Sequence, residues 1–209
     1  MHLQCMQVDI LDKPVEYNEV IKLFDNKEKD KCFILEHNDI YTAGKSVKEQ
    51  IEEINGIKTV HTERGGLWTW HGKGQVVVYF IYNLHKHQMT LTDFFEKIEK
   101  IFVELIKNEI NNDNFVVYAD KDKRGFWIKN KTTNEIAKIG FIGLRVSKGV
   151  LTHGISINYN NDLRWFEYIN PCGLGDVKIT SIQESCKDKT KLNIADFKLK
   201  VAKEIERNF

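Results

Sequence analysis

A glycine-rich segment, residues 64–75, contains the residue types from which a small-molecule pocket can be built. Its sequence is Arg-Gly-Gly-Leu-Trp-Thr-Trp-His-Gly-Lys-Gly-Gln. Paired glycines allow backbone N–H groups to approach a ligand closely, while large apolar side chains form walls and a few polar groups fix orientation. The candidate lining residues are Arg64, Gly65, Gly66, Leu67, Trp68, Thr69, Trp70 and His71. This mixture suits an acyl chain that ends in a polar carbonyl, but a glycine-rich turn with two core tryptophans explains the composition equally well.

Cys172 is a candidate nucleophile because it lies in an irregular Pro-Cys-Gly turn, where a side chain can face a cleft. A reactive cysteine needs an electropositive neighbour that favours the thiolate. Lys138 is the candidate neighbour, since it interrupts the otherwise apolar strand 136–140, and a desolvated lysine has a depressed pKa and can act as a base. The alternatives are a buried, inert cysteine and an edge strand with one exposed lysine.

The composition excludes several classes of protein. Lys and Arg number 31 and Asp and Glu number 30, for a net charge of +1, without the basic excess of a nucleic-acid-binding protein. Neither a phosphate-binding loop nor a dinucleotide fingerprint is complete, and His85 and His87 have no third ligand nearby, so we expect no cofactor and no metal. No secretory signal or membrane-length apolar run is visible, and the cysteines form no disulfide framework. We therefore expect a cytoplasmic protein with no membrane partner.

Periodic apolar residues predict the elements that must position these groups. Helices are expected from Pro14 to Phe24, from Leu91 to Ile110 with Thr90 as its cap, and after Asn193 at the C-terminus. Strands are expected at residues 6–11, 32–36, 76–84, 115–118, 125–129, 135–146 and 150–159. Residues 64–75 and 160–175 are expected to be irregular, and 47–55 a loop or short helix. Because helices and strands do not alternate regularly, the pattern favours an α+β fold, in one domain spanning residues 1–209.

Three ordered blocks of the sequence resemble the octanoyltransferases of lipoate biosynthesis. The first is Arg64-Gly65-Gly66 followed by Thr69, His71, Gly72, Gly74 and Gln75. The second comprises Lys138-Ile139, Gly143-Leu144-Arg145-Val146, His153-Gly154 and Asn158. The third comprises Asp162-Leu163, Phe166 and Asn170-Pro171-Cys172-Gly173. Two positions depart from the signature, with Lys73 in place of proline and Trp70 in place of a smaller tyrosine.

The resemblance implies a mixed β-sheet packed by helices, like the catalytic domains of lipoate and biotin protein ligases. It implies that Cys172 carries an acyl thioester and that Lys138 activates it. It also implies substrate contacts from residues 64–71 and from Phe141, Ile142, Gly143, Gly154, Ile155 and Ser156. Trp68 and Trp70 are expected to set the depth of the acyl pocket.

The implied activity moves an octanoyl group from octanoyl-acyl carrier protein to the ε-amine of a lysine in a lipoyl domain. The implied acceptors are the lipoyl domains of 2-oxoacid dehydrogenase complexes and the glycine cleavage H protein. Replacing a thioester by an amide is downhill, so the reaction needs neither ATP nor metal. Two alternatives stay open at this point, namely an ATP-dependent lipoate-protein ligase and an inactive module that binds lipoyl domains.

Overall fold

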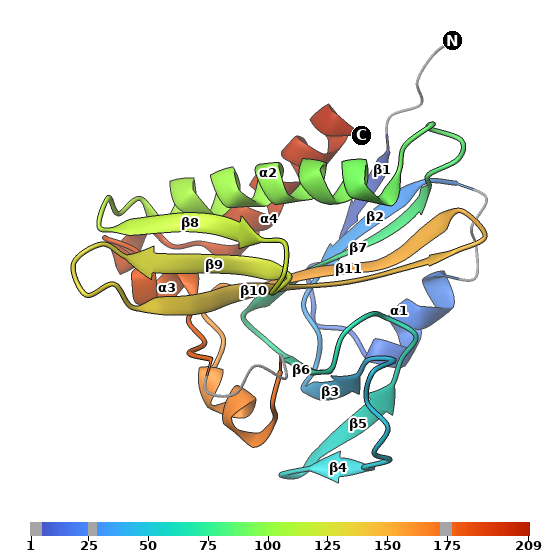
Figure 1. The fold of residues 1–209 in the computed structure, drawn as a ribbon, viewed down its shortest axis with the longest axis horizontal. Helices are drawn as coiled ribbons and strands as arrows, with labels where there is room; N and C mark the ends of the chain where they lie inside the picture. Colours follow the sequence, from blue (N-terminus) through green and yellow to red (C-terminus); the bar gives the residue numbers. More distant parts are fainter. Residues whose placement is uncertain (1–5, 25–28, 172–176) are drawn as a thin grey trace.

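The computed structural model describes residues 6–24, 29–171 and 177–209 (Figure 1). The strands are β1 (Gln7–Ile10), β2 (Lys31–Leu35), β3 (Ile40–Ala43), β4 (Glu53–Ile54), β5 (Ile57–His61), β6 (Trp68–His71), β7 (Gln75–Asn83), β8 (Phe115–Asp120), β9 (Gly125–Asn130), β10 (Ile136–Ser147) and β11 (Val150–Asn158). The helices are α1 (Tyr17–Leu23), α2 (Leu91–Ile110), α3 (Ile182–Ser185) and α4 (Ile194–Asn208), with short 3-10 turns at Leu163–Tyr168 and Lys189–Lys191.

A seven-stranded sheet forms the centre of the molecule, in the order β1-β2-β7-β11-β10-β9-β8. The pairing is antiparallel except between β1 and β2. Strand β7 lies between β2 and β11, which explains its apolar character on both faces. The prediction that this segment is not an edge strand is confirmed.

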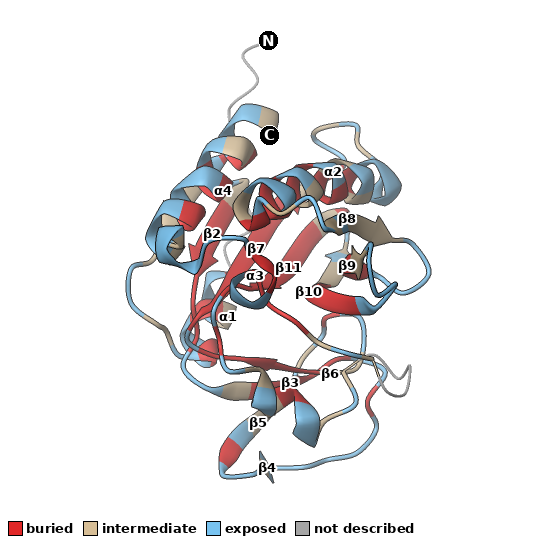
Figure 2. Cartoon of the chain, turned by 90° about the vertical axis from the view of Figure 1, so that its left-hand side faces the viewer, coloured by how far each residue is buried: buried red, intermediate tan, exposed pale blue. Residues whose placement is uncertain are grey.

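The two faces of this sheet carry separate cores. Alternate residues of β7, beginning with Val76, pack with α2 and α4 on one face. The residues between them, beginning with Val77, pack with α1 on the other face. Figure 2 shows α2 and α4 lying together above the buried strands, with the smaller sheet on the opposite side. The α+β class predicted from the sequence is confirmed, since helices cover a mixed sheet.

The helix ends follow the predicted chemistry. The Thr90 side chain accepts from the Asp93 backbone N–H while the Asp93 carboxylate accepts from the Thr90 N–H, forming a capping box at the start of α2. Asn193 caps α4 by accepting from the N–H groups of Ala195 and Asp196. Within the described part of the chain, no helix is both long and apolar enough to cross a membrane.

A second sheet of four strands, in the order β4-β5-β3-β6, was largely missed by the sequence analysis. The glycine-rich segment was expected to be irregular, but its residues Trp68–His71 form β6 and pair with β3. The expectation was wrong because the glycines flank this stretch without interrupting it, so Thr69 and its neighbours pair across to residues near Thr42. The short strand β4 likewise lies inside the expected loop 47–55.

Candidate active site

One cavity of about 430 Å³ lies between the central sheet and the loop that leads into β6. Its size is within the range of small-molecule sites. The lining residues are Arg64, Gly65, Gly66, Leu67, Trp68, Thr69, His71, Val77, Tyr79, Phe95, Asp122, Lys123, Arg124, Lys138, Phe141, Ile142, Gly143, Leu144, His153, Gly154, Ile155, Ser156 and Pro171. Segments far apart in sequence therefore meet in one concave site.

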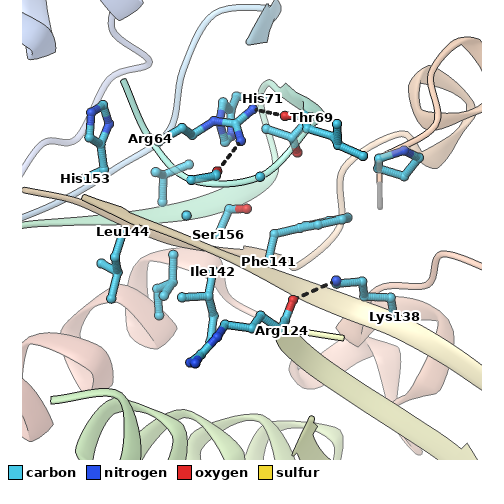
Figure 3. Close-up of a pocket in the computed structure, with 18 of the residues that line it drawn as sticks. Arg64, Thr69, His71, Arg124, Lys138, Phe141, Ile142, Leu144, His153 and Ser156 are labelled. Atoms are coloured by element: carbon cyan, nitrogen blue, oxygen red, sulfur yellow. Dashed lines mark hydrogen bonds between the residues drawn. The ribbon is translucent and has the colours of Figure 1, made fainter. Parts of the chain in front are cut away.

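Lys138 places a buried amine on the wall of this cavity. Its side chain comes from β10, an internal strand, and the residue is only 3% exposed. Its Nζ donates to the carbonyl of Arg124 at 2.8 Å (Figure 3) and to that of Lys123 at 3.4 Å. The same Nζ lies 4.9 Å from the ring centre of Trp127 and 5.1 Å from that of Phe141. The alternative of an exposed lysine on an edge strand is wrong.

The backbone around Lys138 leaves room for its side chain in this position. The pairing of β10 with β9 shifts register between Lys138 and Gly140, which is a β-bulge. Gly125, at φ 145°, passes close to the lysine, and a Cβ there would lie 2.5 Å from Lys138 Cε. A glycine is required at this turn because any side chain would displace the amine.

Arg64 holds the loop that roofs the cavity. Its Nη2 donates to the carbonyl of Thr42 at 2.6 Å and to that of Leu67 at 2.8 Å, and its Nη1 donates to the carbonyl of Gly65 at 3.0 Å. Its Nε donates to Thr42 Oγ1 at 3.1 Å. None of the ion pairs found in the described residues involves Arg64. The guanidinium therefore fixes the loop and leaves a net positive charge buried beside the cavity.

A chain of hydrogen bonds fixes the tautomer of His71. A backbone carbonyl can only accept, so Asn158 Nδ2 must donate to the Thr180 carbonyl, at 3.0 Å. Asn158 Oδ1 then accepts from Gln75 Nε2 at 2.9 Å, and Gln75 Oε1 accepts from His71 Nδ1 at 2.7 Å. The proton of His71 is therefore on Nδ1, and Nε2 carries the lone pair of the neutral ring.

Burial lowers the pKa values of three histidines near the cavity. Desolvation is the largest cause in each case, and it brings the pKa of His37 to about 4, that of His71 to about 3 and that of His153 to about 4. The charge of Arg64 lowers the pKa of His71 and His153 further. All three rings are neutral at pH 7.

These depressed values predict acid destabilisation. Between about pH 6.5 and about pH 4 the unfolded chain binds more protons than the folded chain, so the stability that these histidines contribute is complete above pH 6.5 and is lost as the pH falls. Each histidine contributes up to about 1.4 kcal/mol per pH unit. Denaturant unfolding at several pH values should show this slope, and it should decrease in His37→Gln but not in the exposed control His85→Gln. A free energy of unfolding that stays constant across this pH window would contradict the depressed pKa values of these histidines.

The cavity collects the predicted site residues with two exceptions. Residues 64–69, His71, 141–143 and 154–156 all line it together with Lys138. Cys172 lies outside the residues that the structure describes. Its sequence neighbour Pro171 lines the cavity. On the C-terminal side of Cys172, the Lys178 carbonyl accepts a hydrogen bond from the backbone N–H of Lys138 at 2.8 Å.

Trp70 is the second exception, because it lies in the core and not on the cavity wall. It is 1% exposed, and its ring stacks on Trp165 at 6.5 Å and meets the edge of Phe166 at 5.7 Å. A Cβ on Gly72 would lie 2.1 Å from the Trp70 ring, so the following glycine makes room for the indole. The expectation that Trp70 sets the depth of the acyl pocket is wrong.

We predict that Trp70→Ala costs roughly 3–5 kcal/mol of stability, the usual loss for emptying a core aromatic site. It should leave the choice between short and long acyl chains unchanged. Denaturant unfolding and an acyl competition assay test the two halves separately. Trp68→Ala is the matched control, since Trp68 is only partly buried and should lose less stability. A changed acyl preference in Trp70→Ala with little loss of stability would instead support the expectation that the indole contacts the acyl chain.

Several lining residues were not predicted. Val77 and Tyr79 share one face of β7, and the period of two in that strand could have indicated them. Asp122, Lys123 and Arg124 form the turn between β8 and β9, and no sequence signal connects a charged hairpin turn to a site so distant in the chain.

The class of protein follows from the fold. The chain is similar to a putative lipoate protein ligase from T. acidophilum with bound lipoic acid, with a TM-score of 0.69, 13% identity, and coverage of 98% of this chain and 86% of that one. It is also similar to lipoate-protein ligase A bound with ATP, with a TM-score of 0.67, 14% identity and coverage of 97% and 85%. A biotin protein ligase from Aquifex aeolicus matches at a TM-score of 0.55, with 15% identity and coverage of 97% and 69%. The fold is that of the lipoate and biotin protein ligase catalytic domains.

Sequence comparison narrows this class. Residues 17–206 match the lipoyl protein ligase A/B catalytic domain, and the chain belongs to that family. An octanoyltransferase of Rickettsia peacockii is 38% identical over 170 residues, covering 79% of this chain and 78% of the relative. An octanoyltransferase of Corynebacterium diphtheriae is 33% identical over 156 residues, covering 74% and 60%. The resemblance inferred from the three sequence blocks is confirmed.

Proposed function

We propose that the chain is an octanoyltransferase of lipoate biosynthesis, working as one catalytic domain through an acyl thioester on Cys172. The observation that carries the proposal is the buried amine of Lys138 on the wall of the cavity, close to both described ends of the segment that contains Cys172. The names of the similar proteins support the same reaction, since they are octanoyltransferases.

In the first step Lys138 accepts the thiol proton of Cys172, and the thiolate attacks the carbonyl carbon of an octanoyl thioester. The carbonyls of Lys123 and Arg124 accept hydrogen bonds from Nζ, and these bonds hold the amine at the cavity wall. A carbon–sulfur bond forms to Cys172, the bond to the carrier thiol breaks, and Lys138 returns its proton to the departing sulfur. Backbone N–H groups of the surrounding loops stabilise the tetrahedral oxyanion.

In the second step the neutral ε-amine of an acceptor lysine attacks the acyl-Cys172 carbonyl. A carbon–nitrogen bond forms, the bond to Cys172 breaks, and the surplus amine proton passes through Lys138 to the thiolate. The products are an octanoyl amide and the regenerated thiol. No group needs activation by ATP, because the thioester already supplies the free energy.

The proposed donor is octanoyl-acyl carrier protein, and the proposed acceptors are lipoyl domains, including those of 2-oxoacid dehydrogenases and the glycine cleavage H protein. A lipoyl domain accompanies one lipoate protein ligase of similar fold, from Thermoplasma acidophilum. We place the reaction in the cytoplasm. The free, buried Cys32 and Cys186 suit a reducing compartment.

The test is incubation with octanoyl-acyl carrier protein without acceptor, followed by intact mass. We expect one octanoyl group on the protein, removable by hydroxylamine, and its transfer to an added lipoyl domain without ATP. An ATP-dependent ligase would instead require free octanoate and ATP, and an inactive binding module would bind the lipoyl domain without modifying it. Either result would overturn the proposal.

A further inference from the structure

His153 has a backbone conformation that is unusual for its place in the fold. It lies within β11, yet its φ is +63°, in the left-handed region that non-glycine residues rarely adopt. Such a conformation costs on the order of 1–3 kcal/mol, and strain of this kind is concentrated at functional sites. The imidazole is only 4% exposed and is part of the cavity wall.

This conformation moves the ring to the opposite face of the sheet. His153 pairs with Leu144 across the β10–β11 ladder, and paired residues normally point to the same face. Leu144 packs in the core under α2. Leu151 and Ile155, which lie in β11 two residues before and after His153, pack in the same core. The His153 ring instead meets Phe24 at 5.0 Å, edge to face, and Phe24 belongs to the core under α1.

The cavity on this face is a trough that runs along β10 and β11. Figure 3 shows Lys138 at one end and His153 at the other, with Phe141 and Ser156 between them and the Arg64 loop above. Gly143 and Gly154 lie opposite each other in the ladder, so neither adds a side chain next to His153. The Arg64 side chain covers Gly143, because a Cβ there would lie 3.2 Å from Arg64 Cδ.

We propose that His153 is the end wall of this trough and limits the length of the acyl chain that the enzyme transfers. The proposal rests on the proposed octanoyl transfer, with the thioester near Lys138 and the methyl end of the chain toward His153. The ring is held from behind by Phe24, and its Nδ1 is buried without a hydrogen-bond partner among the described residues. Because its contact with Phe24 fixes the ring in place, the ring can block the end of an alkyl chain by steric contact.

The decisive variant is His153→Gly, which removes the wall and also suits a positive φ. The protein is given an equimolar mixture of octanoyl-, decanoyl- and dodecanoyl-acyl carrier protein with a lipoyl domain, and the products are measured by mass. Each methylene that becomes buried strengthens binding roughly fourfold, so the ratio of dodecanoyl to octanoyl product should rise by roughly tenfold or more. Thermal unfolding is measured in parallel, because relief of the backbone strain raises stability while loss of the ring contact with Phe24 lowers it.

Two further variants complete the experiment. Gln88→Gly relieves a positive φ of 51° at an exposed position away from the cavity, and its product ratio should match the wild type. His153→Asn, which also tolerates positive φ, should give a ratio between those of His and Gly. An unchanged ratio in both His153 variants, with octanoyl transfer intact, would overturn the end-wall proposal alone. Absence of any acyl transfer by the wild type would overturn the proposed function instead.

Discussion

Replacing Lys138 by methionine is expected to reduce the rate of octanoyl transfer by roughly 10²–10⁴-fold, the usual contribution of a positioned acid–base group. Methionine keeps the length and apolar stem of the lysine, so the packing against Trp127 and Phe141 is largely retained. It removes the only atom of this side chain that can accept and return the thiol proton. The rate of acyl-enzyme formation, followed by rapid quench and intact mass, measures the loss directly.

Stability should change little, although two carbonyls lose their donor. The carbonyls of Lys123 and Arg124 belong to an exposed turn, where water can replace the amine. Lys178→Met is the matched control, because Lys178 borders the same backbone but its side chain pairs with Glu135 at the surface. The control should keep its full rate.

Lys138→Arg separates proton transfer from electrostatics. Arginine keeps the positive charge but cannot act as a base, so an essential base predicts loss of activity in this variant also. The larger guanidinium must fit beside Gly125, so unfolding has to be measured in parallel. A folded Lys138→Arg protein with normal turnover would show that the lysine acts only through its charge.

The parts of the fold that the sequence predicts best are those in which one element alone contains the pattern. Helix α2 has an apolar stripe over five turns and a capping box, and β7 is apolar on both faces, so neither needs information from elsewhere in the chain. The order of the strands is different, because it depends on which surfaces pair. The small sheet was missed for this reason: β3 and β6 are four residues each, and their pairing depends on the Arg64 loop that holds them.

The site shows the same division. The glycines and Lys138 are visible in sequence because their types are unusual for their positions, and the cavity brings them together. The misassignment of Trp70 has a local cause, since composition cannot show which side of a strand faces a cavity. His153 was part of the second block of the resemblance but was assigned no role, and regular alternation in β11 would place its side chain under α2. Only its positive φ reveals the reversal.

Cys172→Ala is expected to abolish acyl-enzyme formation and to reduce overall transfer by roughly 10³-fold or more, because the proposed mechanism holds the octanoyl group as a thioester on this thiol. Cys172→Ser should be nearly as inactive, since a hydroxyl has a far higher pKa than a thiol and is poorly activated by an amine. Cys32→Ala and Cys186→Ser serve as controls, because both residues are buried in parts of the fold that do not line the cavity. Intact mass should still show one octanoyl group on each of these two control variants.

The combination of Cys172→Ala with Lys138→Met gives the sharper result. Groups that act as one unit lose their joint contribution when either is removed, so the double variant should be no slower than Cys172→Ala alone. Two residues with independent roles would instead multiply their losses, since their contributions to the barrier would add. Single-turnover transfer to a lipoyl domain, measured for the wild type, both single variants and the double variant, completes the cycle. Multiplied losses would separate Lys138 from the nucleophile and limit it to binding the substrate or orienting the acceptor amine.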